Sequence, residues 1–296
     1  MTVHVWILCN ESAGRSISDD DLKTLVEDAG HSVADLVSTR GDGDHPDLTG
    51  VDLVVAAGGD GTVRSAAKVV AGSSTPVTIL PLGTANNIAT SVGLGGEITD
   101  LIASWHHARR VPFDLGYARA GSKRWHVVEG AGAGLIPAGI AAVERQKPSE
   151  AETASTHPAR EIASAVKAFY GVLDRLEPVR QTVRLDGTVL SEDLLLCEIL
   201  NIRSVGPNLV LSPGASPSDG FFNVVLAGVS HRQALRTYLE HVMNGRQADL
   251  SLPTHHARSI TIDGWSQAHV DDKRVDVSRL GSVAIDIRPG ACTMLL

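Results

Sequence analysis

One segment restricts the fold more than any other: a strand pattern that runs into a glycine loop and then into a helix pattern. Val51–Ala57 is predicted to be a buried strand. It leads into the loop Gly58-Gly59-Asp60-Gly61-Thr62, and helical spacing begins at Val63. Glycines permit positive φ values and close approach to a ligand, and the helix N-terminus offers N–H groups to an anion. On this loop alone, an ordinary strand–helix turn explains the pattern equally well.

The residues of this glycine loop exclude two familiar nucleotide-binding motifs. No Gly-Lys-Ser/Thr follows the loop, so it is not a P-loop, and its glycine spacing is not GxGxxG. Asp60 is unexpected in a loop that only binds phosphate, because its negative charge repels phosphate. The aspartate fits a role with a proton, a metal ion or a ribose.

Two further loops follow apolar runs in the same way. Pro76–Leu80 is a strand candidate that ends in Pro81-Leu82-Gly83-Thr84-Ala85-Asn86-Asn87, where a short helix opens. Val3–Cys9 is another strand candidate, and it is followed by Asn10-Glu11-Ser12-Ala13-Gly14. Ligands of open parallel sheets bind at the carboxyl ends of the strands. We therefore expect the three loops to line one crevice for a phosphate or a nucleotide.

The chain changes character near residue 115. Before it, strand patterns alternate with helix patterns, which predicts a parallel sheet with crossover helices in an α/β domain of three layers over residues 1–115. After it, most patterns are short strands joined by Gly, Pro, Asp and Ser, interrupted by helix patterns at Arg160–Leu176 and His231–Asn244. We expect Glu144–Pro158 to be a loop. The second domain, residues 116–283, is therefore predicted to be β-rich.

Composition excludes several classes of protein. Lys and Arg number 26 against 34 Asp and Glu, for a formal net charge of −8, and this acidic balance argues against a nucleic-acid partner. Neither an apolar run of about 18 residues nor a basic leader with a cleavage site is visible. The cysteines (Cys9, Cys197 and Cys292) are odd in number and widely spaced, which fits a reducing compartment. We expect a cytoplasmic protein in which Cys197 is an ordinary buried thiol.

Resemblance to a known family rests on the three loops together with Phe113-Asp-Leu-Gly116. In these segments the chain resembles the diacylglycerol kinase catalytic family, which includes bacterial lipid kinases and sphingosine kinases and is distantly related to NAD kinases. The resemblance continues, in the right order, through Gly130-Ala-Gly-Ala-Gly134, Ala168-Phe-Tyr170 and Ser212–Asn223. It therefore covers nearly the whole chain, although it does not identify the substrate.

The resemblance implies a fold and two binding sites. The fold is an NAD-kinase-like α/β domain followed by a β-sandwich-like domain, with an ATP site between them and the C-terminal tail, residues 284–296, packed back on the first domain. A turn at Ser216, Asp219 and Phe221 matches a magnesium site, although an ordinary Asp-Gly turn is equally consistent. By motif match, the residues that contact ATP are Asn10, Glu11, Ser12, Ala13, Gly14, Gly58, Gly59, Asp60, Gly61, Thr62, Val63, Arg64, Ser65, Gly83, Thr84 and Asn86. For the Arg64 side chain, we favour surface exposure over contact with phosphates.

Two departures from the family pattern concern acids. The family carries a proposed catalytic carboxylate in a late Asp-Gly-Glu turn, but this chain has Asp271-Asp272-Lys273, and an ammonium group is no proton acceptor at neutral pH. Asn87 also stands where the family has an aspartate. In one hypothesis, Asp271 or Asp272 accepts the proton of the acceptor hydroxyl and Asp60 helps to place Mg²⁺. In the other, the nucleotide crevice survives without phosphoryl transfer. We favour the first.

These observations predict an ATP-dependent lipid kinase that transfers the γ-phosphoryl group to a lipid hydroxyl with Mg²⁺. The alternative from a different class is a catalytically silent ATP-binding protein with a regulatory role. An NAD kinase fits less well, because the long β-rich region containing Ser216–Phe221 is more typical of lipid kinases. The expected partner is a lipid or another small molecule with a hydroxyl group, with transient contact to a membrane surface and no nucleic acid. The oligomeric state stays open, a homodimer included.

Overall fold

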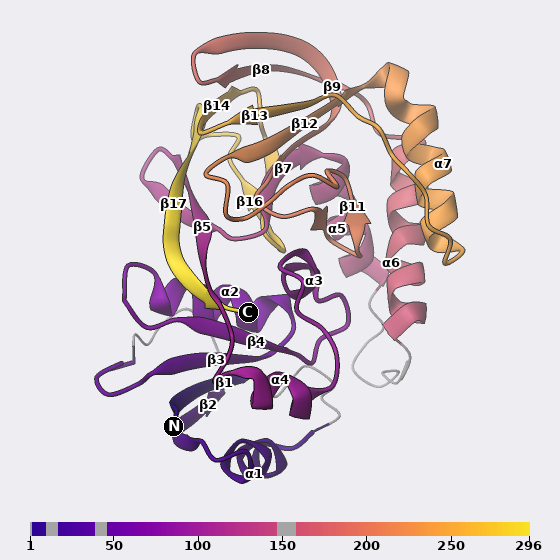
Figure 1. The fold of residues 1–296 in the computed structure, drawn as a ribbon. Coiled ribbons are helices and arrows are strands. Elements are labelled where there is room, and N and C mark those ends of the chain that lie inside the picture. The colour runs from indigo at the N-terminus through magenta and orange to yellow at the C-terminus, as the bar shows by residue number, and fades with distance from the viewer. Residues whose placement is uncertain (1, 10–16, 39–45, 147–157) are drawn as a thin grey trace. The chain divides into compact units, whose positions relative to one another are not determined.

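The computed structural model describes residues 2–9, 17–38, 46–146 and 158–296 (Figure 1). The chain forms two compact units. The first comprises Met1–Leu115, Pro217–Asp219 and Pro289–Leu296, and the second comprises Gly116–Ser216 and Gly220–Arg288. Each unit is described by itself.

The first unit is built on a parallel sheet with the strand order β4-β3-β1-β2. Its strands are β1 (His4–Cys9), β2 (Ser32–Ser38), β3 (Leu53–Gly58) and β4 (Val77–Pro81), and its helices are α1 (Asp19–Asp28), α2 (Asp60–Val70), α3 (Asn87–Ser91) and α4 (Ile98–Ser104). All residues of β3 are buried, as its continuous apolar pattern predicts. Helix α1 begins at the N-cap Ser18, whose hydroxyl accepts a hydrogen bond from the Asp21 N–H (3.1 Å).

The end of the chain also belongs to this sheet. β17 (Val283–Leu295) brings Met294 beside Val77 of β4 in parallel register. The Thr78 hydroxyl donates to the Leu295 carbonyl (2.9 Å), and Arg109 and Leu296 exchange backbone hydrogen bonds of 2.7 and 2.9 Å. The last residues of the chain therefore extend the edge of the sheet that β4 forms.

The second unit is dominated by antiparallel strands. The sheet order β16-β15-β7-β9-β8-β14-β17 is antiparallel at every step, and β12 pairs with both β9 and β13. These strands are β7 (Gly130–Gly134), β8 (Val179–Leu185), β9 (Thr188–Leu200), β12 (Phe222–Gly228), β13 (Thr254–Ala257), β14 (Ser259–Asp263), β15 (Gln267–Val270) and β16 (Lys273–Asp276). Two hairpins complete the unit: β5 (Arg110–Ala120) with β6 (Lys123–Val127), and β10 (Ser204–Val205) with β11 (Leu209–Val210).

Helices of the second unit pack as a row beside this sheet. They are α5 (Leu135–Gln146), α6 (Pro158–Leu173) and α7 (Arg232–Met243), which follows the short 3₁₀ turn η1 (Val229–His231). Helix α6 lies between α5 and α7, as Figure 1 shows for α6 and α7. Arg232 of α7 donates to the Leu173 carbonyl and to the Leu176 carbonyl (2.7 Å), so a guanidinium group caps the negative end of α6.

The predicted fold class, an α/β domain followed by a β-sandwich-like domain, is confirmed, but two local predictions are wrong and one strand is missed. Helix α5 continues to Gln146 and α6 begins at Pro158, so both ends of the predicted loop Glu144–Pro158 are helical, and its residues 147–157 lie outside the described residues. The predicted single strand Ala268–Val277 is a hairpin, β15 and β16, that turns at residues 271–272. β2 was not predicted, because exposed and partly buried residues alternate irregularly along it.

No helix within the described parts of the chain is both long and apolar enough to cross a membrane.

Candidate functional site

The two described glycine loops of the first unit touch through their backbones. β3 and β4 are neighbours, and the Leu82 N–H donates to the Gly58 carbonyl (3.1 Å) just beyond the strand ends. A Cβ atom added to Gly83 would lie 2.3 Å from the Gly59 Cα, and one added to Gly59 would lie 3.2 Å from the Gly83 Cα. Position 83 therefore requires glycine, a side chain at position 59 would be tight, and the loops lie side by side as expected from their place at the ends of parallel strands.

Asn86 shapes the second loop from within. Its backbone adopts the left-handed conformation (φ 51°). Its side-chain oxygen accepts from the Gly83 N–H (3.1 Å), and its amide nitrogen donates to the Gly83 carbonyl (2.8 Å). The asparagine therefore closes a ring with Gly83 that holds the loop next to Gly59. Thr84, at the tip of this loop, is exposed.

Asp60 ties the first loop to helix α3. One carboxylate oxygen accepts from the Asn87 N–H (3.0 Å) and the other from the Ile88 N–H (2.9 Å). A carboxylate at a helix N-terminus satisfies N–H groups that have no partner within the helix and complements the helix dipole. Asp60 therefore has a structural role at the start of α3, and its part with a proton, a metal ion or a ribose stays a prediction.

The N-terminus of α2 gathers groups that suit an anion. The helix starts after Gly59, and no described side chain caps it. The Arg64 side chain is buried (8% exposed), and one guanidinium nitrogen lies 3.5 Å from the position of a Cβ on Gly61, so the surface location favoured for Arg64 is wrong. Thr62 is also buried (1% exposed), and its hydroxyl has no hydrogen-bond partner in the described part of the chain.

The remaining predicted nucleotide contacts divide into three groups. Ser65 points back to the same helix, where its hydroxyl donates to the Gly61 carbonyl (3.2 Å). Val63 is buried in the core of the first unit, so only its backbone is suited to contact a ligand. The predicted contacts Asn10, Glu11, Ser12, Ala13 and Gly14 lie outside the described residues.

The turn predicted to bind Mg²⁺ has residues in both units. Asp219 is exposed in a turn of the first unit, whereas Ser216 and Phe221 belong to the second unit. The Asp114 N–H donates to the Pro217 carbonyl (2.7 Å), which fixes the start of this turn. Across the described ranges, no cluster of three or more His, Cys, Asp or Glu side chains is arranged to hold a metal ion. A cation at this turn would depend on one carboxylate together with carbonyl oxygens, a donor set that suits Mg²⁺ or Ca²⁺.

In the second unit, the predicted catalytic acids lie in the turn between β15 and β16. Asp271 is buried (7% exposed) and adopts the left-handed conformation (φ 54°). One oxygen of its carboxylate accepts from the N–H groups of Val128 (3.0 Å) and Glu129 (2.8 Å). Asp272 and Lys273 are exposed. Asp271 is thus an anchor of the turn, and Asp272 presents the more accessible carboxylate.

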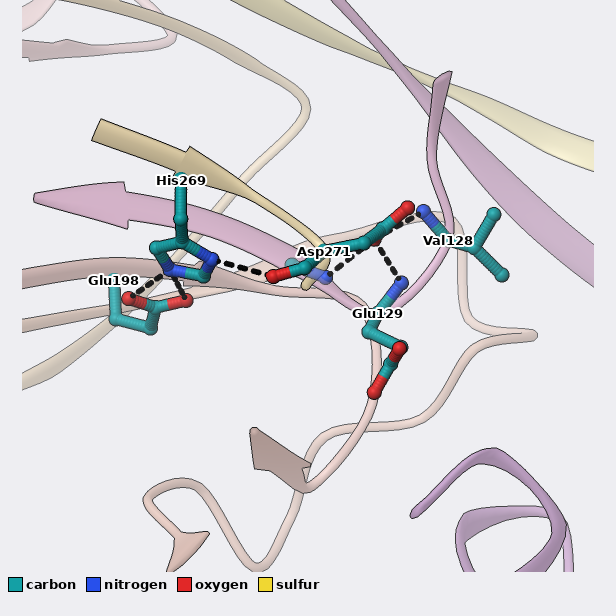
Figure 2. Close-up of polar contacts among 6 residues, drawn as sticks. Val128, Glu129, Glu198, His269 and Asp271 are labelled. Carbon is teal, nitrogen blue, oxygen red and sulfur yellow. Dashed lines mark hydrogen bonds and ion pairs between the residues drawn. The ribbon is translucent and has the colours of Figure 1, made fainter. Parts of the chain in front are cut away.

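A buried ionisable pair lies next to this turn. Figure 2 shows the ring of His269 between the Glu198 carboxylate and the backbone carbonyl of Asp271. Burial raises the pKa of the Glu198 carboxyl group, although the charge of His269 opposes this shift. Burial alone would lower the pKa of His269, but the adjacent Glu198 carboxylate outweighs it and raises that pKa. The two residues lie 71 positions apart, and no spacing in the sequence predicts that they pair.

The fold and the paired loops define an NAD-kinase-like α/β domain joined to a β-sandwich-like domain. Residues 4–118 match the family model of the diacylglycerol kinase catalytic domain. Residues 134–296 match the model of the YegS C-terminal NAD kinase beta sandwich-like domain. The chain belongs to the diacylglycerol kinase catalytic family, with a C-terminal domain of the YegS type.

Individual relatives agree with this assignment. The chain is 27% identical over 224 residues to a diacylglycerol kinase of Mycobacterium tuberculosis (strain ATCC 25618 / H37Rv), covering 72% of this chain and 67% of the relative. It is 26% identical over 277 residues to a probable lipid kinase YegS-like of Cronobacter sakazakii (strain ATCC BAA-894), covering 87% of each. A crystal structure of a diacylglycerol kinase from Bacillus anthracis str. Sterne superimposes with a TM-score of 0.70 at 18% identity, covering 99% of this chain and 96% of that one. The structural likeness supports the fold alone, and the relatives make the chain kinase-like at the family level.

Proposed function

We propose that this protein transfers the γ-phosphoryl group of ATP, with Mg²⁺, to the hydroxyl group of a lipid. The observation that carries the proposal is the backbone contact of Gly59 with Gly83 beside the N-terminus of α2. With the two glycine loops locked together at the strand ends, the backbone at the N-terminus of α2 carries no bulky side chains that would keep a phosphate chain away.

The residues present suit the phosphates of ATP. The buried Arg64 guanidinium lies next to Gly61 and supplies positive charge, and the buried Thr62 hydroxyl, which has no described partner, supplies a hydrogen-bonding group. Phosphoryl transfer depends largely on positioning and on neutralising charge, which these groups provide. By resemblance, Asn10–Gly14 and Thr84 complete the nucleotide contacts. Mg²⁺ would neutralise phosphate oxygens, with Asp60 as the carboxylate we propose to help place it, and the Asp219 turn would hold a separate, structural Mg²⁺.

The acceptor hydroxyl must lose a proton to a base, and Asp272 is the acid we assign to that task. The carboxylate of Asp271 already accepts backbone N–H groups, which stabilises its charged form and makes it a poor base. Lys273 is exposed beside Asp272 and is suited to neutralise phosphate. In this proposal Asp271 holds the turn and Asp272 does the proton chemistry.

A second candidate function is ATP binding without transfer. Three observations favour it: Asn87 and Lys273 stand where the family has acids, and Asp271 is used as an anchor. In that case the glycine loops bind nucleotide and the protein acts as a regulator. NAD phosphorylation ranks third, because residues 134–296 match the YegS-type sandwich domain.

The test combines transfer assays with calorimetry of ATP binding. Purified protein is incubated with Mg²⁺ and γ-labelled ATP against diacylglycerol, sphingosine, phosphatidylglycerol and NAD. We expect a labelled lipid, and we expect Asp272→Asn to lower its rate by about 100-fold or more. Asp276→Asn, an exposed acid of the same hairpin, is the control and should leave the rate unchanged. Tight ATP binding without labelled product from any acceptor would favour the regulatory function, and absence of ATP binding would refute both.

A further inference from the structure

The sheet of the second unit contains an ionisable pair with no exposure to solvent. Glu198 of β9 and His269 of β15 are both 0% exposed, and the His269 Nε2 atom lies 2.9 and 3.0 Å from the two Glu198 oxygens. Removing two such groups from water costs several kcal/mol, and apolar residues of similar volume often give equal or greater stability. Stability alone is therefore a weak explanation for this pair.

The strand between the two residues is built to let them meet. Gly132 of β7 is the register partner of Glu198 on one side and of His269 on the other. A Cβ atom on Gly132 would lie 1.9 Å from a Glu198 oxygen, and one on Gly130 would lie 3.2 Å from the other oxygen. The glutamate therefore crosses over bare backbone to reach the histidine. The alternating glycines of the Gly130–Gly134 segment create the space for this contact.

The histidine connects the glutamate to the turn. Its Nδ1 atom lies 2.7 Å from the Asp271 carbonyl oxygen. A carbonyl only accepts hydrogen bonds, so Nδ1 carries the proton and donates it. Glu198, which holds Nε2 at the opposite side of the ring, fixes the orientation of the imidazole. Figure 2 shows the resulting chain from Glu198 through His269 to Asp271.

The left-handed backbone conformation of Asp271 requires stabilising contacts of this kind. A non-glycine residue in the left-handed region costs about 1 kcal/mol or more, and its φ is 54°. The Asp271 N–H donates to the Gly130 carbonyl (2.8 Å), while its side chain accepts from Val128 and Glu129. With the bond from His269, backbone and side-chain contacts fix the turn from which Asp272 projects.

We propose that Glu198 and His269 are positioning residues that hold the Asp271–Lys273 turn in the geometry that phosphoryl transfer needs. The inference rests on the proposed kinase function, in which Asp272 accepts the acceptor's proton. Glu198 orients His269, His269 binds the Asp271 carbonyl, and the fixed carbonyl sets the direction of the next residue. Neither residue touches the reacting atoms.

Two substitutions of His269 separate this role from a general contribution to folding. In His269→Asn the amide nitrogen stands near the place of Nδ1 and keeps the bond to the Asp271 carbonyl, whereas in His269→Gln it stands near the place of Nε2 and keeps the contact with Glu198. We expect kcat for the lipid substrate to fall about tenfold in His269→Gln and only about threefold in His269→Asn, since a small displacement of a reacting group is costly. KM for ATP should stay within about twofold of wild type in both.

Substitutions of Glu198 provide a rescue test and a matched control. Glu198→Gln retains a polar partner for Nε2 and should lose about threefold in kcat, whereas Glu198→Ala leaves the ring unanchored and should lose about tenfold. Gln181→Met removes another buried hydrogen bond of this unit, from Trp265 Nε1 (2.9 Å), a bond that involves none of Glu198, His269 and Asp271, and should leave kcat unchanged. Equal losses in His269→Asn and His269→Gln, or a tenfold loss in Gln181→Met, would overturn the proposal.

Hydrogen exchange tests the same inference without any activity. Exchange at the N–H groups of Val128, Glu129 and Asp271 should be at least about fivefold faster in His269→Gln than in His269→Asn, because the turn loses its bond from the ring. Unchanged exchange would overturn the positioning role even if the protein is an active kinase. Faster exchange in a protein that phosphorylates no acceptor would retain the role of the pair in the turn and refute only the kinase function.

Discussion

Replacing Gly83 with alanine tests whether the contact between the two glycine loops creates the nucleotide site. The new Cβ atom would lie 2.3 Å from the Gly59 Cα and 3.0 Å from the Gly59 nitrogen. Carbon atoms in contact prefer a separation of about 3.5–4.0 Å. The Gly59 atoms belong to the backbone, which no rotamer change can move, so the loops must separate by more than about 1 Å.

The cost of that separation follows from the contacts it breaks. Overpacking costs about 1–3 kcal/mol. Two hydrogen bonds also lengthen, from Leu82 N–H to the Gly58 carbonyl and from Gly83 N–H to the Asn86 side chain, and each contributes about 1 kcal/mol. We expect a loss of about 3–5 kcal/mol in the free energy of unfolding, which lowers the Tm by about 6–20 °C for a protein of this size.

Differential scanning calorimetry measures the Tm, and titration calorimetry measures the Kd for ATP. Gly95→Ala is the matched control in the same unit, since a Cβ there meets no atom within 4 Å. It should change stability by less than about 0.5 kcal/mol and leave ATP binding unchanged. Gly83→Ala should weaken ATP binding at least about tenfold, because the N–H groups no longer converge. Wild-type affinity in a destabilised Gly83→Ala protein would refute the link between loop contact and nucleotide binding.

Three further predictions concern charge. Asp60→Asn keeps one acceptor oxygen of two and should lower the free energy of unfolding by about 1–3 kcal/mol in urea, whereas Asp100→Asn, in exposed sequence of α4, should cost less than about 0.5 kcal/mol. Both Glu198 and His269 have raised pKa values in the folded state, so the stability they supply is complete below their ordinary pKa values of 4.5 and 6.5 and is lost as pH rises through the folded values. The stability difference between wild type and a Glu198→Gln/His269→Asn double variant should therefore shrink with rising pH in urea titrations, and a difference that grows would contradict the assignment. Chelation by EDTA should stop phosphoryl transfer, because Mg²⁺ is proposed to neutralise the phosphate oxygens of ATP, and transfer that continues without Mg²⁺ would contradict that role.

The sequence located the strand–loop–helix units well and their boundaries less well. Helical spacing is visible only from Val63, but α2 begins at Asp60. Gly61 is a poor helix former, so the first turn carries no periodic signal. The first turn of α2 follows Gly59 and is stabilised by a tertiary contact, because the Asp60 carboxylate accepts hydrogen bonds from N–H groups at the start of helix α3. Such a contact joins residues that are 27 positions apart and cannot be inferred from local propensity.

The hairpin of β15 and β16 shows a different limit of the sequence. Two-residue hairpin turns with positive φ at the first central position favour glycine there, and Asp271-Asp272 contains no glycine, so the segment is predicted as one strand. The structure supplies the missing stabilisation from distant backbone, since the Asp271 carboxylate accepts N–H groups of Val128 and Glu129. These partners are more than 100 positions away in sequence. The amino-acid composition of the turn alone gives no indication of these two partners.

The buried pair of Glu198 and His269 has one indication in the sequence, the glycine-rich segment Gly130–Gly134, which above supports only the family resemblance. Glycine at alternate positions of Gly130–Gly134 leaves one face of a strand without side chains. Such a face is expected where another group comes close to the backbone, and here that group is the Glu198 carboxylate. The pattern predicts that something crosses the strand. It does not predict what crosses, because the partner lies on β9 and its register is fixed only by the folded sheet.

The two departures from the family acids have opposite electrostatic consequences for binding and for chemistry. Asn87 is buried (3% exposed), and its N–H binds the Asp60 carboxylate. An aspartate at this position would place a second buried negative charge near the first, which is costly without a cation, whereas the amide has no such cost. Lys273 likewise replaces a negative group by a positive one. Both changes favour an anion such as ATP and remove groups that could accept a proton, so the proposed phosphoryl transfer would depend on Asp272.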